Sequence, residues 1–216
     1  MGGCCSCFGT KETGNQETEM TSRSNGAESN GVSSLTIARH MTAPSVEIEN
    51  ARILKGSGLA LVGVTVEQDA AYWEWHVESL KEDGPPLEDD EDPSNALMFG
   101  VATMKNPKFY RAMALNEDSD TSNAEDGTAL MKPITELRDG DTVGVAVQQS
   151  DLPMIQFFLN GEPLHELAIN RFRGAVYPSI YMREGFKTRL VLDENEFKEM
   201  SPHARFGPLI AARGII

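Results

Sequence analysis

Apolar and polar residues alternate along several short stretches of the chain. In AYWEWHVES, residues 71–79, the bulky Trp73, Trp75 and Val77 share one face, whereas the residues between them are mostly polar. Such a period of two residues indicates a β-strand with one buried face, because successive side chains of a strand point to opposite sides. We therefore predict a half-buried strand here, with both tryptophans in the core.

Two further stretches carry the same signal. In DTVGVAVQQ three valines alternate with Gly144 and Ala146, which predicts one bulky face and one closely packed face. In IQFFLNGEPL, residues 155–164, an alternating run ends at Asn160 and Gly161. Asn-Gly is the dipeptide best suited to the positive φ angles of a type I′ turn, so this stretch predicts a β-hairpin.

More strands are expected between turn-forming residues. Gly, Pro, Asp or Asn bound four apolar stretches, at residues 58–66, 97–104, 175–182 and 186–193. Many short strands without intervening helices are typical of an all-β sandwich or barrel.

Two strongly acidic loops interrupt the pattern, at residues 81–95 and 116–127. The second begins at Asp118 with the spacing of an EF-hand calcium loop. Asn123 stands where that loop requires glycine, and Ala129 stands where it requires a bidentate glutamate. We therefore interpret both loops as solvated surface and expect no metal and no cofactor.

Composition narrows the class of protein. Apolar residues are concentrated after about residue 45 of the 216-residue chain, which favours one domain of roughly 150 residues. The formal net charge of −14 repels phosphate backbones and argues against a nucleic acid partner. The sequence contains neither an apolar run of about 18 residues nor a secretory signal, so we expect a cytosolic protein that does not span a membrane.

The N-terminus carries the sharpest local motif. The chain opens MGGCCSCF, with Gly2 after the initiator methionine and Ser6 where the N-myristoylation pattern requires Ser or Thr. One myristoyl chain binds membranes only weakly, and the nearby cations are interleaved with glutamates, so a second lipid is needed. Palmitoylation of Cys4, Cys5 or Cys7 would supply it. The sequence therefore predicts a lipid anchor on the cytoplasmic face of a membrane.

Two other interpretations of this segment stay open. All three cysteines of the chain lie in it, and they are either incidental to a disordered tail or part of a metal-binding cluster. A metal site would need a fourth ligand, and the first histidine is only at position 40. We favour residues 1–9 as a lipidation segment and residues 10–45, poor in large apolar residues, as a disordered flexible tether.

Four motifs along the domain resemble one known family. They are FGVAT from Phe99, GDTVGVAV from Gly140, FFLNG from Phe157 and VYP from Val176. Their order and spacing are similar to those of a SPRY domain, and the likeness runs from about Glu49 to Pro208. The chain most resembles the short single-domain proteins of the SPRY domain-containing protein seven type, although the acidic insertion at 81–95 departs from them.

The resemblance implies a SPRY domain over residues 46–208, followed by a C-terminal tail at 209–216. It implies a bent sandwich of two antiparallel sheets, similar to a concanavalin-like jelly roll, with loops at one end that recognise short peptides of other proteins. Carried onto this chain, the loops after the FGVA and YP strands supply the candidate protein-binding residues Phe109, Tyr110, Arg111, Tyr181, Arg183 and Glu184.

The function expected from all this is a membrane-tethered adaptor that acts as a monomer. No GxSxG, HExxH or phosphate-binding glycine loop is present, and the domain contains no cysteine nucleophile. We therefore expect no enzyme activity, with His76 and His165 structural or solvent-exposed. The alternative function is a membrane scaffold or coat protein that self-associates through exposed edge strands. Carbohydrate binding, suggested by the architecture alone, is disfavoured by the cytosolic location.

Overall fold

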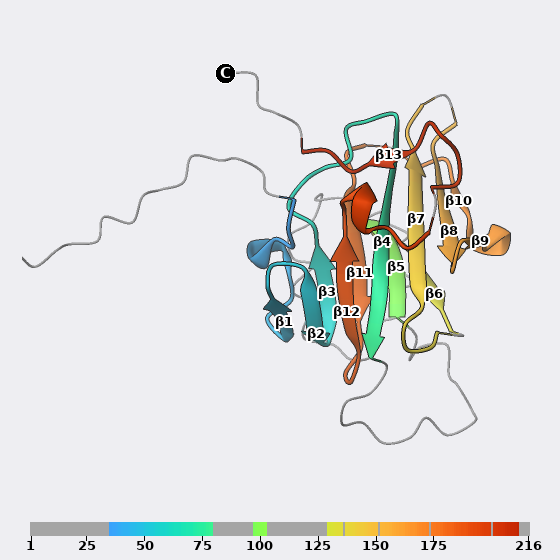
Figure 1. Cartoon of the computed structure of the whole chain (residues 1–216). Helices are drawn as coiled ribbons and strands as arrows, with labels where there is room; N and C mark the ends of the chain where they lie inside the picture. The colour runs from blue at the N-terminus through green and yellow to red at the C-terminus, as the bar shows by residue number, and fades with distance from the viewer. Residues whose placement is uncertain are drawn as a thin grey trace, which may run out of the picture. The chain divides into compact units, whose positions relative to one another are not determined.

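The computed structural model describes part of the chain, and these residues belong to one compact unit, Val32–Ile216 (Figure 1). The described ranges are 35–79, 97–102, 129–135, 137–150, 152–172, 174–199 and 201–211. Within them, the helices are three short 3₁₀ turns: η1 (Arg39–Met41), η4 (His165–Leu167) and η5 (Glu194–Glu196). No helix in these ranges is long and apolar enough to cross a membrane.

The larger of two sheets has nine strands. Seven form a continuous path in the order β1 (Val46–Glu49), β2 (Ile53–Gly56), β12 (Lys187–Val191), β4 (Ala70–Ser79), β7 (Thr142–Gln148), β8 (Met154–Leu159) and β10 (Ile169–Asn170). The short β9 (Glu162–Pro163) pairs with β8, and β13 (Gly207–Pro208) pairs with β4. The β13–β4 ladder is parallel, and the other ladders between the described strands are antiparallel.

The smaller sheet has four antiparallel strands in the order β3 (Gly58–Leu61), β11 (Tyr177–Met182), β5 (Leu97–Ala102) and β6 (Ala129–Ile134). The predicted two-sheet antiparallel β-sandwich is confirmed. Each of the four stretches 58–66, 97–104, 175–182 and 186–193 contains a strand.

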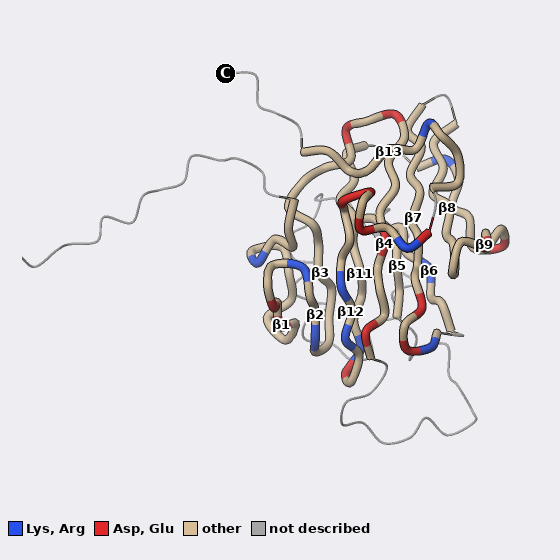
Figure 2. The backbone as a smooth tube through the Cα atoms, viewed as in Figure 1, with Lys and Arg blue, Asp and Glu red and all other residues tan. Residues whose placement is uncertain are grey.

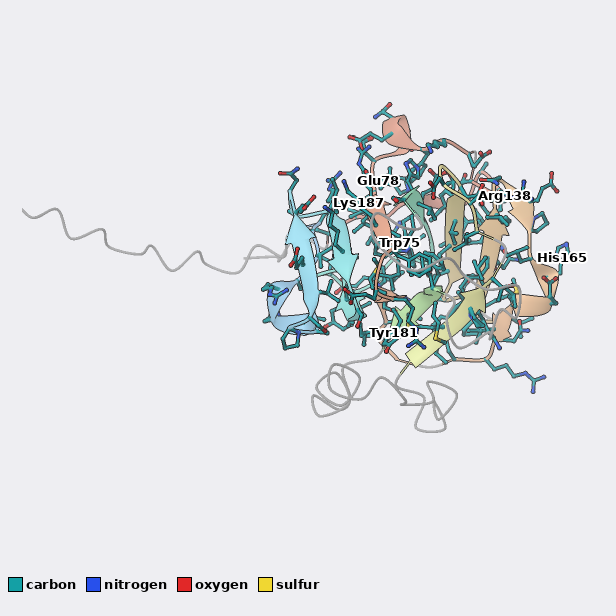
Figure 3. All side chains as sticks on the ribbon, turned by 90° about the horizontal axis from the view of Figure 1, so that it is seen from below. Trp75, Glu78, Arg138, His165, Tyr181 and Lys187 are labelled. Atoms are coloured by element: carbon teal, nitrogen blue, oxygen red, sulfur yellow. The ribbon has the colours of Figure 1, made fainter. Side chains whose placement is uncertain are left out.

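The core lies between the sheets, as the alternation predicted. Trp73 and Trp75 of β4 are fully buried, and the ring centroids of Trp75 and Phe99 of the smaller sheet are 6.5 Å apart. Figure 3 shows Trp75 between the sheets, with Tyr181 on one side and Lys187 on the other. The valines of β7 join this core, whereas Gly144 faces outward against another buried side chain.

The Asn-Gly hairpin forms as predicted. Asn160 and Gly161 have φ angles of 50° and 81°, and they connect β8 to β9 with Leu159 opposite Glu162. The Asn160 side chain also accepts a hydrogen bond from the Thr142 N–H at 2.9 Å. The turn residue therefore ties the hairpin to the start of β7.

Five strands were not predicted: β1, β2, β6 and the two-residue strands β10 and β13. β1 and β2 are each four residues long: β1 (VEIE) alternates over only two periods and β2 (ILKG) does not alternate, so neither gave a strand signal. β6 contains Pro133, a residue that normally argues against a strand. Pro133 is tolerated here because, among the described strands, β6 is at the edge of its sheet and pairs only with β5.

The flexible tether predicted for residues 10–45 ends earlier than expected. Ile37 and Ala43 are buried in the main core, and the Ala38 N–H donates to the Leu61 carbonyl at 2.8 Å. Ile37 forms an isolated bridge with Val62. Residues 36–43 thus cover the free edge of β3, and assigning residues 35–45 to the tether was wrong because their few apolar side chains all pack inward.

The C-terminal boundary also shifts. Leu209 is 2% exposed and packs in the main core, and the Ile210 N–H donates to Gln68 Oε1 at 2.9 Å. The start of the tail predicted at 209–216 is therefore part of the folded domain.

Candidate functional site

The outer face of the smaller sheet is centred on β11. Tyr177, Ser179 and Tyr181 alternate along this strand and point away from the main core. Tyr181 lies opposite Leu59 of β3 and Met98 of β5, so these side chains form one apolar row. Tyr181 is only 3% exposed.

Arg183 follows at the end of β11, where the chain turns toward β12. Its guanidinium carbon lies 4.9 Å from the centroid of the Tyr181 ring, a cation–π arrangement. Among the described residues, the buried Arg183 Nε–H has no hydrogen-bond partner, and neither does the buried Ser179 hydroxyl on the same strand. Glu184, the next residue, is exposed.

Of the predicted binding residues, the structure describes Tyr181, Arg183 and Glu184. Phe109, Tyr110 and Arg111 lie outside the described residues. Tyr181 and Arg183 contact each other, and the Tyr181 ring is buried beneath the guanidinium instead of standing exposed. Arg183 and Glu184 are the accessible members of this group.

Other predicted sites also fall outside the described residues. They are the lipidation residues Gly2, Cys4, Cys5 and Cys7, and the acidic loops at 81–95 and 116–127. Each stays a prediction.

A second polar cluster, which was not predicted, lies on the outer face of the larger sheet. Glu74 of β4 is fully buried. Its carboxylate accepts hydrogen bonds from the Tyr72 hydroxyl at 3.1 Å and from the N–H groups of Lys198 and Glu199, each at 2.9 Å. His76 Nε2 lies 2.7 Å from its other side. The expected exposed face of β4 is therefore covered, and the prediction of a half-buried strand was wrong on that side.

These contacts decide the ionisation of the cluster. Burial by itself raises the pKa of Glu74, but the bonds from His76 and from the two backbone N–H groups outweigh it and leave the pKa lowered. The pKa of Tyr72 is raised, first because the phenol is buried and second because Glu74 is charged beside it. Glu74 is thus an ionised, fully hydrogen-bonded carboxylate inside the fold.

The cluster is enclosed, which limits its chemistry. Glu74 and His76 are a potential acid–base pair, yet they are 0% and 6% exposed. Within the described ranges, no group of three or more His, Cys, Asp or Glu side chains is arranged to hold a metal ion. His165 is exposed beside the β9 turn, as expected.

Surface charges on the larger sheet are paired. Figure 2 shows basic residues along β2 and β12 with acidic residues nearby. Lys187 contacts Glu78 at 3.2 Å, and Arg189 contacts Glu196 at 2.5 Å. Arg183, in contrast, has no ion pair among the described residues.

Comparisons with solved structures identify the fold. The Drosophila melanogaster neuralized-NHR1 domain matches with a TM-score of 0.53 at 9% identity, over 74% of this chain and 98% of that one. The TRIM65 PSpry domain matches with a TM-score of 0.52 at 11% identity, over 74% of this chain and 90% of that one. No family model and no curated protein matches the sequence.

The resemblance inferred from four motifs is therefore confirmed at the level of the fold. The described residues form a SPRY-type β-sandwich. The closer likeness to the protein seven type stays a prediction.

Proposed function

We propose that this domain is a non-enzymatic interaction module that recognises short peptide segments of other proteins at the β11–β12 end of the sandwich. The proposal rests on the environment of Arg183. Its guanidinium is stacked on Tyr181, and its buried Nε–H has no acceptor among the described residues. Buried donors are nearly always paired in folded proteins. Because the Arg183 side chain as a whole is only half-buried, a peptide carbonyl or side-chain oxygen is the partner that we infer for its guanidinium.

The chemistry of the surroundings supports this proposal. Arginine and tyrosine are enriched at binding hot spots, because each combines a large contact area with hydrogen-bonding capacity. The aromatic ring holds the guanidinium in one place, which lowers the entropy lost on binding. The one described acid–base pair is closed off under other residues, so it supports a structural role and not catalysis.

The test compares Arg183, which is stacked on Tyr181, with Arg138, which is in a different environment. Arg138 is exposed and lies well away from Tyr181 in Figure 3. Proximity labelling with the intact protein identifies partners, and peptides from those partners are then titrated against purified variants. Arg183→Ala should weaken peptide binding by about 30-fold, corresponding to about 2 kcal/mol for a hot-spot residue, whereas Arg138→Ala should leave binding unchanged.

Two results would contradict the proposal. One is that Arg183→Ala, still folded with a melting temperature within a few degrees of the parent, binds the peptides as well as the parent does. The other is that molecular mass rises with concentration while no peptide titration saturates, which would favour the self-associating scaffold. Tyr110→Ala, made in parallel, tests the predicted residues outside the described part of the chain.

We further propose that the module is attached to the cytoplasmic face of a membrane by myristoylation of Gly2 and palmitoylation of Cys4, Cys5 or Cys7. The support is the sequence MGGCCSCF together with the weak membrane affinity of a single acyl chain.

Fractionation of cells tests this anchor. Gly2→Ala should move the protein to the soluble fraction, because palmitoylation then lacks the first docking step. Replacing the three cysteines by Ser should give weak, reversible association. Full membrane retention of Gly2→Ala would show that another feature provides the attachment.

A further inference from the structure

The segment after β12, described at residues 193–199 and 201–211, crosses the outer face of the larger sheet, and we refer to it as the strap. Figure 1 shows it passing in front of β4 and β7 before it reaches β13. Phe197 and Phe206 pack from the strap onto Tyr72, Ala146 and Phe158 of the sheet. The Tyr72 and Phe197 rings meet edge to face, with centroids 5.2 Å apart.

Several contacts hold the strap to the sheet, including the Arg189–Glu196 ion pair and a bond from Arg205 to Gln148, and two of the attachment points differ chemically. The first is ionic: the Lys198 and Glu199 N–H groups donate to the Glu74 carboxylate. The second is neutral: Gln68 donates from Nε2 to the Pro208 carbonyl at 2.8 Å and accepts at Oε1 from the Ile210 N–H at 2.9 Å. Of these two anchors only the first depends on a titratable acceptor, and a further carboxylate of the strap, the exposed Glu196, contacts the sheet in its pair with Arg189.

Because one of these anchors is a carboxylate and the other is not, we propose that acid releases the strap from the sheet. The strap then detaches from Glu74, while its bonds to Gln68 and the sandwich stay intact. Detachment uncovers Tyr72, Ala146 and Phe158, an aromatic face of β4, β7 and β8. Glu74 is the residue that controls it, because a protonated carboxyl is a much weaker acceptor for two backbone N–H groups than a carboxylate.

The direction of the pH dependence follows from the environment of Glu74. Its pKa is lower in the fold than the ordinary value of 4.5. The attachment is therefore at full strength above pH 4.5 and weakens as the pH falls through the lower folded pKa. Between the ordinary pKa of 4.5, which applies once the strap is detached, and the lower folded pKa, each pH unit increases the opening constant about tenfold, and below the folded pKa the opening constant levels off.

Other charged groups near Glu74 are few. His76 and Tyr72 flank it on β4, and Gly144 is its uncharged neighbour on β7. Arg189 of β12 is opposite His76 and pairs with Glu196. On the strap, the Lys198 ammonium donates to the Gly140 carbonyl at 3.1 Å, and the Glu199 charge acts on Tyr72.

One other carboxylate of the strap has a lowered pKa. Asp193 is exposed and accepts hydrogen bonds from the backbone and side chain of Asn195. It caps η5 and has no hydrogen bond to the sheet in this structure. Asp193→Asn is therefore a matched control for Glu74→Gln, since each replaces one low-pKa carboxylate by its amide.

Amide hydrogen exchange, measured by NMR on the full chain as protection factors between pH 7 and pH 3, tests the proposal. The N–H groups of Lys198 and Glu199 should lose protection at a higher pH than those of Ile210 and Val145, which report the neutral anchor and the sheet. Equal loss at all four positions at every pH would show that the strap opens only when the whole domain unfolds.

Two variants then assign the titrating group. Glu74→Gln should show low protection at Lys198 and Glu199 already at pH 7, with little further change in acid, whereas Asp193→Asn should keep the parent's pH profile. If Glu74→Gln retains the parent's pH profile, Glu74 is not the controlling residue. If Glu74→Gln does not fold, the pH series on the parent still decides whether the strap opens separately.

Discussion

Gly144 is the position where one added methyl group most directly tests the packing of the covered sheet face. A Cβ at this residue would lie 2.5 Å from the Tyr72 hydroxyl oxygen and 2.8 Å from its Cε2, whereas ordinary contacts between such atoms are about 3.5 to 4 Å. Tyr72 would therefore have to move by about 1 Å. It is 1% exposed and is held by Phe197 and by its bond to Glu74.

The expected cost of Gly144→Ala follows from these contacts. Overpacking a well-packed core costs about 1 to 3 kcal/mol, and loss of a hydrogen bond to a charged group adds about 1.5 to 3 kcal/mol. We expect the free energy of unfolding to fall by about 3 to 5 kcal/mol if both occur. For a domain of this size the melting temperature would fall by roughly 6 to 20 °C.

Denaturant unfolding of a double-mutant cycle with Tyr72→Phe is the assay. Removing the hydroxyl removes the closest contact, so the second change should partly rescue the first, with a coupling free energy of at least about 1 kcal/mol. Gly207→Ala is the control, since nothing lies within 4 Å of its Cβ position. Strict additivity of the two changes, or a Gly144→Ala protein as stable as the parent, would refute this account of the packing.

Two further predictions concern the core and the domain boundary. Trp75→Ala should cost about 3 to 5 kcal/mol in chemical denaturation, and a loss below about 1 kcal/mol would contradict the full burial of this ring. A fragment of residues 35–211 should unfold in one cooperative transition by circular dichroism. A fragment of residues 46–211 should be less stable, because it lacks the buried Ile37 and Ala43. Equal stability of the two fragments would show that residues 35–45 contribute nothing to the stability of the domain.

The sequence predicted those parts of the fold that depend on local patterns. The alternation around Trp75 and the Asn160–Gly161 turn involve residues that are close in sequence. The strand and the hairpin that they predicted are both present. The short strands β1 and β2 were missed because four residues cover at most two periods of an alternation.

The covered face of β4 could not be predicted in this way. Glu74 and His76 are polar, as residues on a solvent-exposed strand face usually are. Their burial is favourable only because the N–H groups of Lys198 and Glu199, from a distant part of the chain, donate to Glu74. For the candidate site, family resemblance placed Tyr181 and Arg183 together. It could not show that the tyrosine is buried or that the Arg183 Nε–H lacks an acceptor, because both depend on packing between strands.

The attachment of the strap also has a consequence for the synthesis of the protein. The bonds from Lys198 and Glu199 to Glu74 join residues 124 and 125 positions apart, and those from Gln68 span 140 and 142 positions. Chains are made at about 5 to 20 residues per second. At least about 6 seconds therefore pass between the synthesis of Glu74 in β4 and the synthesis of the strap residues that bind it. The Glu74 carboxylate therefore stays hydrated until residues 198 and 199 have been made, and the cover of β4 forms only after the larger sheet up to β12 has been synthesised.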